Sequence, residues 1–237
     1  MRATNFEFRY RFYIVSLIFW FGFSCYWIDH QNAAESIALL VGFTSTFALK
    51  LVLGFGALIV AIGAAIRTWA TAYIHSDVVH DMDLHSDRLV AEGPYRYVRN
   101  PLYLGVLLLS AGMGLMASRV GWFVLVVANT LFYLRLALRE EAALAAAQGE
   151  AYLAYKRTVP RIIPSLTPRL LSSGRTPQWG QAFVGESFMW AFAVVTLLFA
   201  VTLWSRRSWA LTGVILLGYF AGQMFLRRKK RLAGTQL

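Results

Sequence analysis

The chain contains one cysteine, Cys25, within an apolar run, which excludes a disulfide bond inside the chain. It is also short of charge: charged residues make up 15% of its 237 residues, whereas a soluble domain has about 25%. Hydrophobic residues make up 58%, in runs too long for the core of a soluble domain. We therefore predict an all-α, polytopic helical membrane protein.

Acidic residues are the rarer charge type, with 12 Asp and Glu against 23 Lys and Arg and a net charge of +11. A charge of this size can indicate nucleic-acid binding. Here the basic residues cluster between apolar runs, a pattern that sets membrane topology, so we expect no nucleic-acid partner. No small-residue cleavage site follows Arg2, Arg9 and Arg11, so we expect the first apolar run to remain as an anchor.

About six transmembrane helices are predicted. They cover residues 12–28, 51–73, 102–117, 120–138, 183–204 and 209–226. The third and fourth are short of the roughly 20 residues that a crossing needs, so their ends must extend into flanking polar positions. Residues 35–49 are ambiguous, because they could lie in the interface or re-enter the membrane. If they cross, the count becomes seven.

The distribution of Lys and Arg favours six spans over seven. With six spans, most basic residues lie on one side, in the amino-terminal tail and in segments 75–101, 135–178 and 227–231. We therefore expect an integral protein of a bacterial inner (plasma) membrane with both termini in the cytoplasm. Arg67 lies within the second span, where its side chain can snorkel toward the basic side.

The stretch from Gly93 to Gly105, GPYRYVRNPLYLG, is the most informative part of the chain. It precedes one apolar run, and the Glu140-Glu141 pair follows the next. A short turn near Ser118 makes the two runs antiparallel, so both motifs meet at one membrane edge. That edge gathers groups that suit a polar ligand: Arg96, Arg99, Asn100, Tyr103, Glu140 and Glu141.

Residues 139–157 are rich in Ala and Leu and predict a helix that continues from the fourth span into the cytoplasm. Tyr152 and Tyr155 share a face of this helix, where packing is the more ordinary role. A linker rich in Ser, Pro and Gly follows. The last two spans carry no polar cluster, so we expect them to be structural.

Three pieces of sequence carry a family resemblance: GPYRYVRNPLYLG, the Glu140-Glu141 pair and GEAYLAYKRTVPRIIP. Together they resemble the isoprenylcysteine carboxyl methyltransferase family and the related phospholipid N-methyltransferases. The resemblance covers about residues 65–165 and includes TWATAY and DRLVAEGPYR. It implies an integral membrane enzyme that uses S-adenosyl-L-methionine (SAM) and methylates a lipidic substrate drawn from the membrane.

The predicted spans, the family-like core and the linker divide the chain into four parts. Amino-terminal transmembrane helices would occupy residues 1–74, the methyltransferase core 75–168, a linker 169–182, and a carboxy-terminal hairpin with a basic tail 183–237. Cofactor-binding roles carried over by position fall on Leu89, Val90, Tyr95, Asn100, Pro101, Tyr103 and Glu140.

Two positions depart from the family pattern. Asn100 stands where the family has a histidine between Arg and Pro, and an amide can hydrogen-bond but cannot titrate. A binding role survives that exchange, whereas a proton-transfer role does not. Leu136 stands where the family has a substrate-facing arginine. Arg135 and Arg139 flank that position and are the candidate catalytic residues.

The chemistry of these residue types fits methyl transfer. A carboxylate acceptor is already ionised at neutral pH, so an enzyme mainly has to align it with the methyl donor, and an arginine can grip it with two hydrogen bonds. Glu140 suits the ammonium or ribose hydroxyl groups of SAM. Tyr95 and Tyr103 offer ring faces to an adenine or a sulfonium.

Ordinary structural roles compete with these assignments. Tyr95, Tyr97 and Tyr103 could form an aromatic belt, and Arg96 and Arg99 could be topology signals alone. Glu141 fits a solvated helix face better than a ligand contact. No metal site is expected at His75, His80 and His85, because steps of five residues do not share a helix face.

SAM-dependent transfer to a lipidic acceptor is thus the first hypothesis, with an isoprenylcysteine-type carboxylate or a related group as the acceptor. A phospholipid or amine N-methyltransferase, an NADPH-dependent membrane reductase and a non-catalytic membrane scaffold are the alternatives. The sequence leaves the acceptor and the oligomeric state open. The absence of a GxGxxG fingerprint decides little, because membrane reductases do not require one.

Overall fold

A computed structural model describes residues 1–42, 44–74 and 91–203, and every regular element in these ranges is a helix. The helices are α1 (Asn5–Arg9), α2 (Arg11–Ser24), η1 (Cys25–Trp27), α3 (Ala33–Leu40), α4 (Thr46–Tyr73), η2 (Gly93–Arg96), α6 (Pro101–Gly114), α7 (Arg119–Gln148), α8 (Glu150–Thr158), α9 (Trp179–Gly185) and α10 (Ser187–Thr202). η1 and η2 are short 3₁₀ helices.

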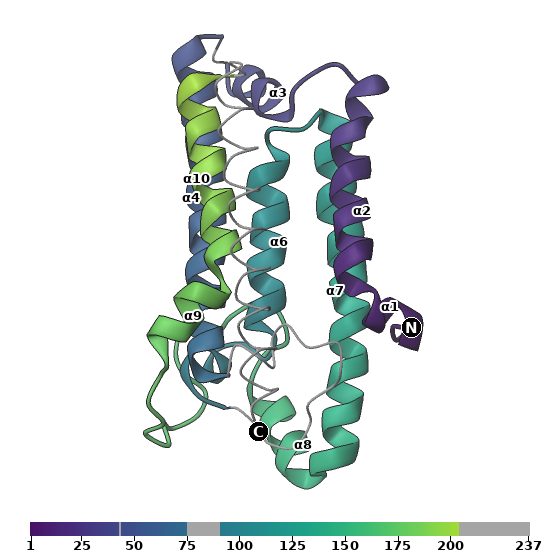
Figure 1. The fold of residues 1–237 in the computed structure, drawn as a ribbon, viewed down its shortest axis with the longest axis vertical. Helices are drawn as coiled ribbons and strands as arrows, with labels where there is room; N and C mark the ends of the chain where they lie inside the picture. Colours follow the sequence, from purple (N-terminus) through teal and green to yellow (C-terminus); the bar gives the residue numbers. More distant parts are fainter. Residues whose placement is uncertain (43, 75–90, 204–237) are drawn as a thin grey trace, which may run out of the picture.

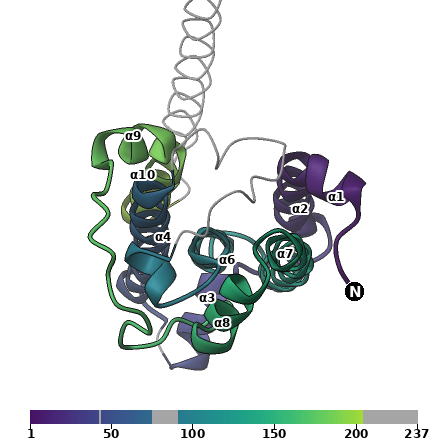
Figure 2. The ribbon, with the colours of Figure 1, turned by 90° about the horizontal axis from the view of Figure 1, so that it is seen from below.

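The long helices run side by side along the longest axis of the molecule, and α3 lies across one end (Figure 1). Seen along that axis, they follow one another in the order α10, α4, α6, α7, α2 (Figure 2). α8 lies at the end opposite α3. We call these the α3 end and the α8 end.

The fold is that of a helical membrane protein. Within the described ranges, α4 and α7 are long and apolar enough to cross a membrane, and α9 with α10 would add a third span if the 59° bend between them lies within one crossing. α2 and α6 have 14 residues each, fewer than a full crossing needs. The structure thus supports two or three spans by length and composition, and the predicted span 209–226 lies outside the described residues.

The ambiguous segment 35–49 does not form a helix of its own. Its first part belongs to α3, whose first turn is capped by Asn32 through a hydrogen bond from the amide of Glu35. Its last part belongs to α4, which starts at Thr46 because the Ser45 side chain caps it, accepting a hydrogen bond from the amide of Ala48. The second predicted span is therefore longer than the sequence pattern indicated.

Glycines bring α4 and α6 into close contact. A Cβ atom at Gly56 would lie 2.8 Å from the carbonyl oxygen of Gly112, and one at Gly63 would lie 2.7 Å from that of Gly105. Small residues at such crossings let two helix backbones approach in a membrane, where packing rather than the hydrophobic effect holds helices together. This contact fixes the start of α6, which carries the site, relative to α4.

We expect Gly56→Ala to lower the stability of the protein by about 1–3 kcal/mol, because the added methyl group overpacks the α4–α6 interface. Gly54→Ala is the matched control, since a Cβ atom there meets nothing within 4 Å. The control should be neutral or slightly stabilising, because alanine favours helix over glycine. Thermal unfolding in detergent measures both variants, and equal melting temperatures would contradict the close packing.

Candidate functional site

Tyr103 and Glu140 meet at the α8 end, although 37 residues separate them in the chain. Pro101 starts α6, which places Tyr103 in its first turn. α7 is longer than α6, and its later turns carry Glu140 back to the same level. The Tyr103 hydroxyl donates a hydrogen bond of 2.5 Å to Oε1 of Glu140, and its ring packs against that of Tyr133 with centroids 4.9 Å apart.

Glu141 lies in the interior and not on a solvated helix face, so that expectation is wrong. Its side chain is 3% exposed. Arg99 donates to it from two guanidinium nitrogens at 3.1 Å each, Arg161 donates to both carboxylate oxygens at 2.9 and 3.0 Å, and the amide of Asn100 donates at 3.3 Å. This carboxylate is the centre of a buried ionic network beside Glu140.

Arg99 is more than a topology signal, because it joins two distant segments. Its guanidinium also donates to the carbonyl oxygens of Lys156 and Val159 at 2.7 and 2.5 Å. Backbone amides continue the contact: Arg99 donates to the oxygen of Pro160 at 2.8 Å, and Asn100 to that of Arg161 at 3.2 Å. The segment after α8 is thereby held against the start of α6.

Asn100 takes part in the same contact. Its side-chain amide donates to Glu141 and also to the carbonyl oxygen of Arg161 at 3.1 Å. The hydrogen bond from Arg161 to Glu141 raises the pKa of the Arg161 guanidinium above its usual value. Through these two bonds, the Asn100 amide joins the ionic network without titrating. The predicted role of Asn100 in cofactor binding stays a prediction.

Tyr95 carries a buried hydroxyl group that is available to a ligand. The residue is 7% exposed, and its hydroxyl group has no hydrogen-bond partner within the described ranges. Burial raises the pKa of this phenol well above its usual value, so the hydroxyl stays protonated and can donate. A buried polar atom without a partner is costly, and a polar group of a bound molecule would satisfy it.

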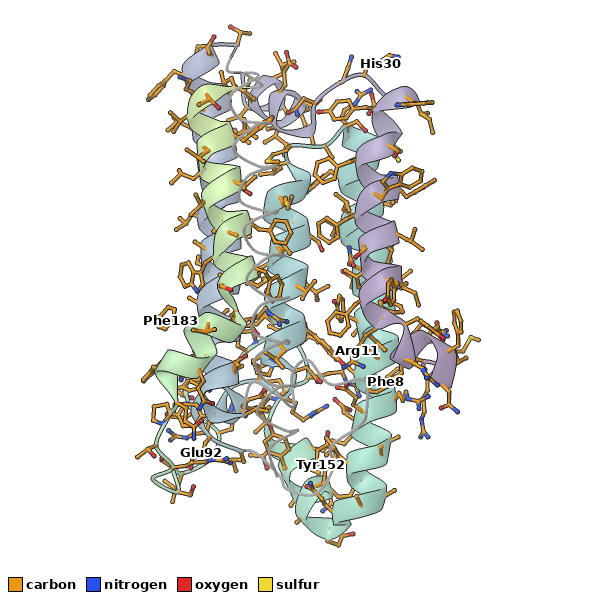
Figure 3. The ribbon with its side chains drawn as sticks, in the orientation of Figure 1. Phe8, Arg11, His30, Glu92, Tyr152 and Phe183 are labelled. Atoms are coloured by element: carbon orange, nitrogen blue, oxygen red, sulfur yellow. The ribbon has the colours of Figure 1, made fainter. Side chains whose placement is uncertain are left out.

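Tyr152 and Tyr155 are packing residues, as expected. Both belong to α8 and are buried in a cluster with Val159, and Figure 3 shows Tyr152 at the α8 end of the molecule. The Tyr155 hydroxyl donates to the backbone oxygen of Tyr95 at 2.9 Å. Tyr155 therefore joins α8 to η2 and helps to fix the position of Tyr95.

Arg135 and Arg139 point to the amino-terminal helix α1. Arg135 donates to both carboxylate oxygens of Glu7 at 3.1 and 2.9 Å, and Arg139 donates to the oxygen of Ala3 at 3.2 Å and to the side chain of Asn5 at 2.6 Å. The bonds from Arg135 lower the pKa of Glu7 to about 2, so this ion pair is kept at neutral pH. The predicted catalytic role of the two arginines remains a prediction.

Helix α1 and the place of Arg11 near Glu140 were not predicted from the sequence. Figure 3 shows Phe8 and Arg11 where α1 meets α2, beside α7. The positive charge of Arg11 attracts the Glu140 carboxylate. A signal was present: Thr4 and Glu7 form a capping box, with hydrogen bonds of 2.7 and 3.2 Å. The spacing of Thr and Glu before apolar residues predicts a helix start.

Arg67 does not snorkel, which corrects the expectation for that residue. Its guanidinium donates to both oxygens of Glu186, at 2.6 and 2.9 Å, where the chain bends between α9 and α10. Glu186 is fully buried. The carboxy-terminal region therefore carries a polar cluster that the sequence analysis did not identify.

Two groups of predictions concern other regions. Leu89, Val90 and the histidine series at 75, 80 and 85 lie outside the described residues. A hollow of about 390 Å³ at the α3 end is lined by apolar side chains such as Leu51, Phe55 and Trp122. The side chains that line it offer no charged group to a polar ligand.

The family of phospholipid methyltransferases matches residues 49–151. This range runs from α4 through α6 and α7 to the start of α8, so it includes Tyr95, Asn100, Tyr103 and Glu140. Comparison with curated proteins and with solved structures gave no match. The resemblance to membrane methyltransferases is therefore confirmed, and residues 49–151 carry the pattern of the phospholipid methyltransferase family.

Proposed function

We propose that this protein transfers a methyl group from SAM to a lipidic acceptor at the cytoplasmic face of the membrane. The contact between Tyr103 and Glu140 carries the proposal, since it joins the two family motifs into one site. The α8 end faces the cytoplasm in this account, because the basic residues of the sequence gather on that side.

The residues fit SAM, which supplies a methyl group on a sulfonium when bound. Glu140 would accept hydrogen bonds from its ammonium or ribose hydroxyl groups, and the hydroxyl of Tyr95 would find a partner in it. Leu89, Val90, Asn100 and Pro101 complete the proposed cofactor site. The Glu141 network would hold this site together rather than contact the cofactor, because its oxygens already accept bonds from Arg99 and Arg161.

An apolar acceptor would enter sideways from the bilayer, since its tail gains nothing by passing through water. If its reactive head is a carboxylate, as in an isoprenylcysteine, Arg135 or Arg139 would hold it. They lie four residues apart on one helix face, next to Glu140. This role requires the arginine to exchange Glu7 or Asn5 for the substrate.

A lipid amine is the second candidate acceptor, and one observation favours it. Glu7 neutralises Arg135, so the site presents one positive charge fewer than the sequence suggests, whereas Arg139 bonds to the neutral groups of Ala3 and Asn5 and keeps its charge. A protonated amine is repelled by an unpaired arginine nearby, and the pairing of Arg135 with Glu7 reduces that repulsion.

Replacing Arg135 or Arg139 by lysine separates the two acceptors. Lysine keeps the charge but loses the planar fork that grips a carboxylate. With a prenylcysteine acid, we expect methyl transfer from labelled SAM to fall about tenfold in at least one variant. With an aminophospholipid, both variants should keep the wild-type rate.

The outcome is read from labelled lipid, with SAM affinity measured in parallel. Arg157→Lys is the matched control, since that exposed arginine on α8 pairs only weakly with Glu150 at 3.7 Å. Full activity of both variants on the acid would contradict the carboxylate assignment. Absence of transfer to either lipid class by the wild type would contradict the proposed function.

A further inference from the structure

The buried pair of Arg67 and Glu186 lies outside the site just described, and its chemistry is unusual for a membrane helix. Arg67 belongs to α4, one of the two helices of the described ranges that are long and apolar enough to cross a membrane by themselves. Arg67 is 7% exposed, and Glu186 is fully buried. Charged groups at membrane depth are costly and mark functional positions more often than stabilising ones.

The pair connects the family region to the rest of the chain. Arg67 lies within residues 49–151, whereas Glu186 lies beyond them. Thr71 adds a hydrogen bond of 2.9 Å to the same carboxylate, and Trp190 of α10 donates to Thr68 at 3.0 Å. These hydrogen bonds join the bent start of α10 to α4, beside apolar packing of Met189 against Ala64.

The remaining nitrogen of the Arg67 guanidinium contacts α6. Nη1 of Arg67 donates to the carbonyl oxygen of Leu102 at 3.1 Å. Leu102 is the neighbour of Tyr103 in the first turn of α6, where the helix begins at Pro101. Glycine at position 105 makes room for the arginine, because a Cβ atom there would collide with the Arg67 side chain.

We propose that Arg67, held in orientation by Glu186, is a positioning residue that fixes the first turn of α6 and so sets the Tyr103 hydroxyl against Glu140. The α9–α10 region then contributes to the function, because its Glu186 carboxylate orients the Arg67 guanidinium. This inference rests on the proposed function for its effect on SAM, while the anchoring of α6 stands on geometry alone.

Two variants and one control test the inference in the full-length protein. Arg67→Met combined with Glu186→Leu removes both charges together, which leaves no unpaired charge in the interior. Arg67→Lys keeps the positive charge opposite Glu186 but lacks the planar guanidinium, which donates hydrogen bonds to both Glu186 and Leu102. Thr71→Val, the control, removes a hydrogen bond to Glu186 and leaves the bond to Leu102 in place.

We expect both variants to raise the Kd for SAM about tenfold, the scale of one lost hydrogen bond to a charged group. The KM for the lipid acceptor should stay unchanged, and hydrogen exchange should speed up in the first two turns of α6. The control should match the wild type in the Kd for SAM, in the KM for the lipid acceptor and in the rate of hydrogen exchange in α6. A purely structural role would reduce the amount of folded protein but would leave the Kd of the folded fraction unchanged.

The outcomes separate the two claims. Wild-type SAM affinity in both variants overturns the positioning role, whether or not exchange in α6 changes, and leaves the proposed function intact. Failure of the wild type to bind SAM overturns the proposed function, and the exchange measurement then still decides whether Arg67 anchors α6. Unchanged exchange in both variants overturns the anchoring itself.

Discussion

Replacing Glu140 by alanine should weaken SAM binding by at least about 1.5 kcal/mol, or roughly tenfold in Kd, the scale of a hydrogen bond to a charged group. The carboxylate accepts the hydrogen bond of Tyr103 and is the acidic group that we propose binds the cofactor. Isothermal titration of the purified protein in detergent measures the change.

Two further variants sharpen this test. Tyr103→Phe keeps the ring and removes only the hydroxyl that orients Glu140, so its effect should be smaller than that of Glu140→Ala. Glu150→Ala, on the exposed start of α8 with its side chain 82% exposed, should bind SAM like the wild type. Unchanged affinity in Glu140→Ala, with the protein folded, would remove this residue from the site.

The neighbouring substitution Glu141→Ala should act on stability instead. It leaves the Arg99 guanidinium, whose side chain is 7% exposed, without its carboxylate in the interior. Loss of one partner of a buried ion pair costs about 3–5 kcal/mol. Thermal or denaturant unfolding in detergent should show this loss, while Glu150→Ala unfolds like the wild type, because exposed ion pairs contribute little.

Limited proteolysis localises the effect of Glu141→Ala. Arg99 holds the backbone at Lys156 and Val159 through its bonds to Glu141 and to those carbonyl oxygens. We therefore expect new cleavage between residues 150 and 169 in the variant. A variant as stable as the wild type would show that the network is not required for the fold.

The sequence predicted the part of the site that depends on helix lengths. Two apolar runs joined near Ser118 had to form antiparallel neighbours, and this brought Tyr103 and Glu140 to one edge. The start of α4 was predicted too late, because apolar character was given more weight than the capping side chain of Ser45.

What the sequence could not supply were the partners of charged side chains. Glu141 appeared solvated, because a glutamate at the end of a helix usually is; only the fold brings Arg99 and Arg161 to it. Glu186 meets Arg67 from a distance of 119 residues in the chain. No periodicity or spacing encodes such a pair, whereas the capping box of Thr4 and Glu7 was readable from the sequence.

Titration of the purified, full-length protein with SAM and, separately, with NADPH tests the central claim most directly. A membrane methyltransferase must bind SAM, a membrane reductase must bind NADPH, and a scaffold need bind neither. We predict saturable binding of SAM that Glu140→Ala weakens and Glu150→Ala does not, with no binding of NADPH. Binding of NADPH without SAM, or of neither molecule, would contradict the account.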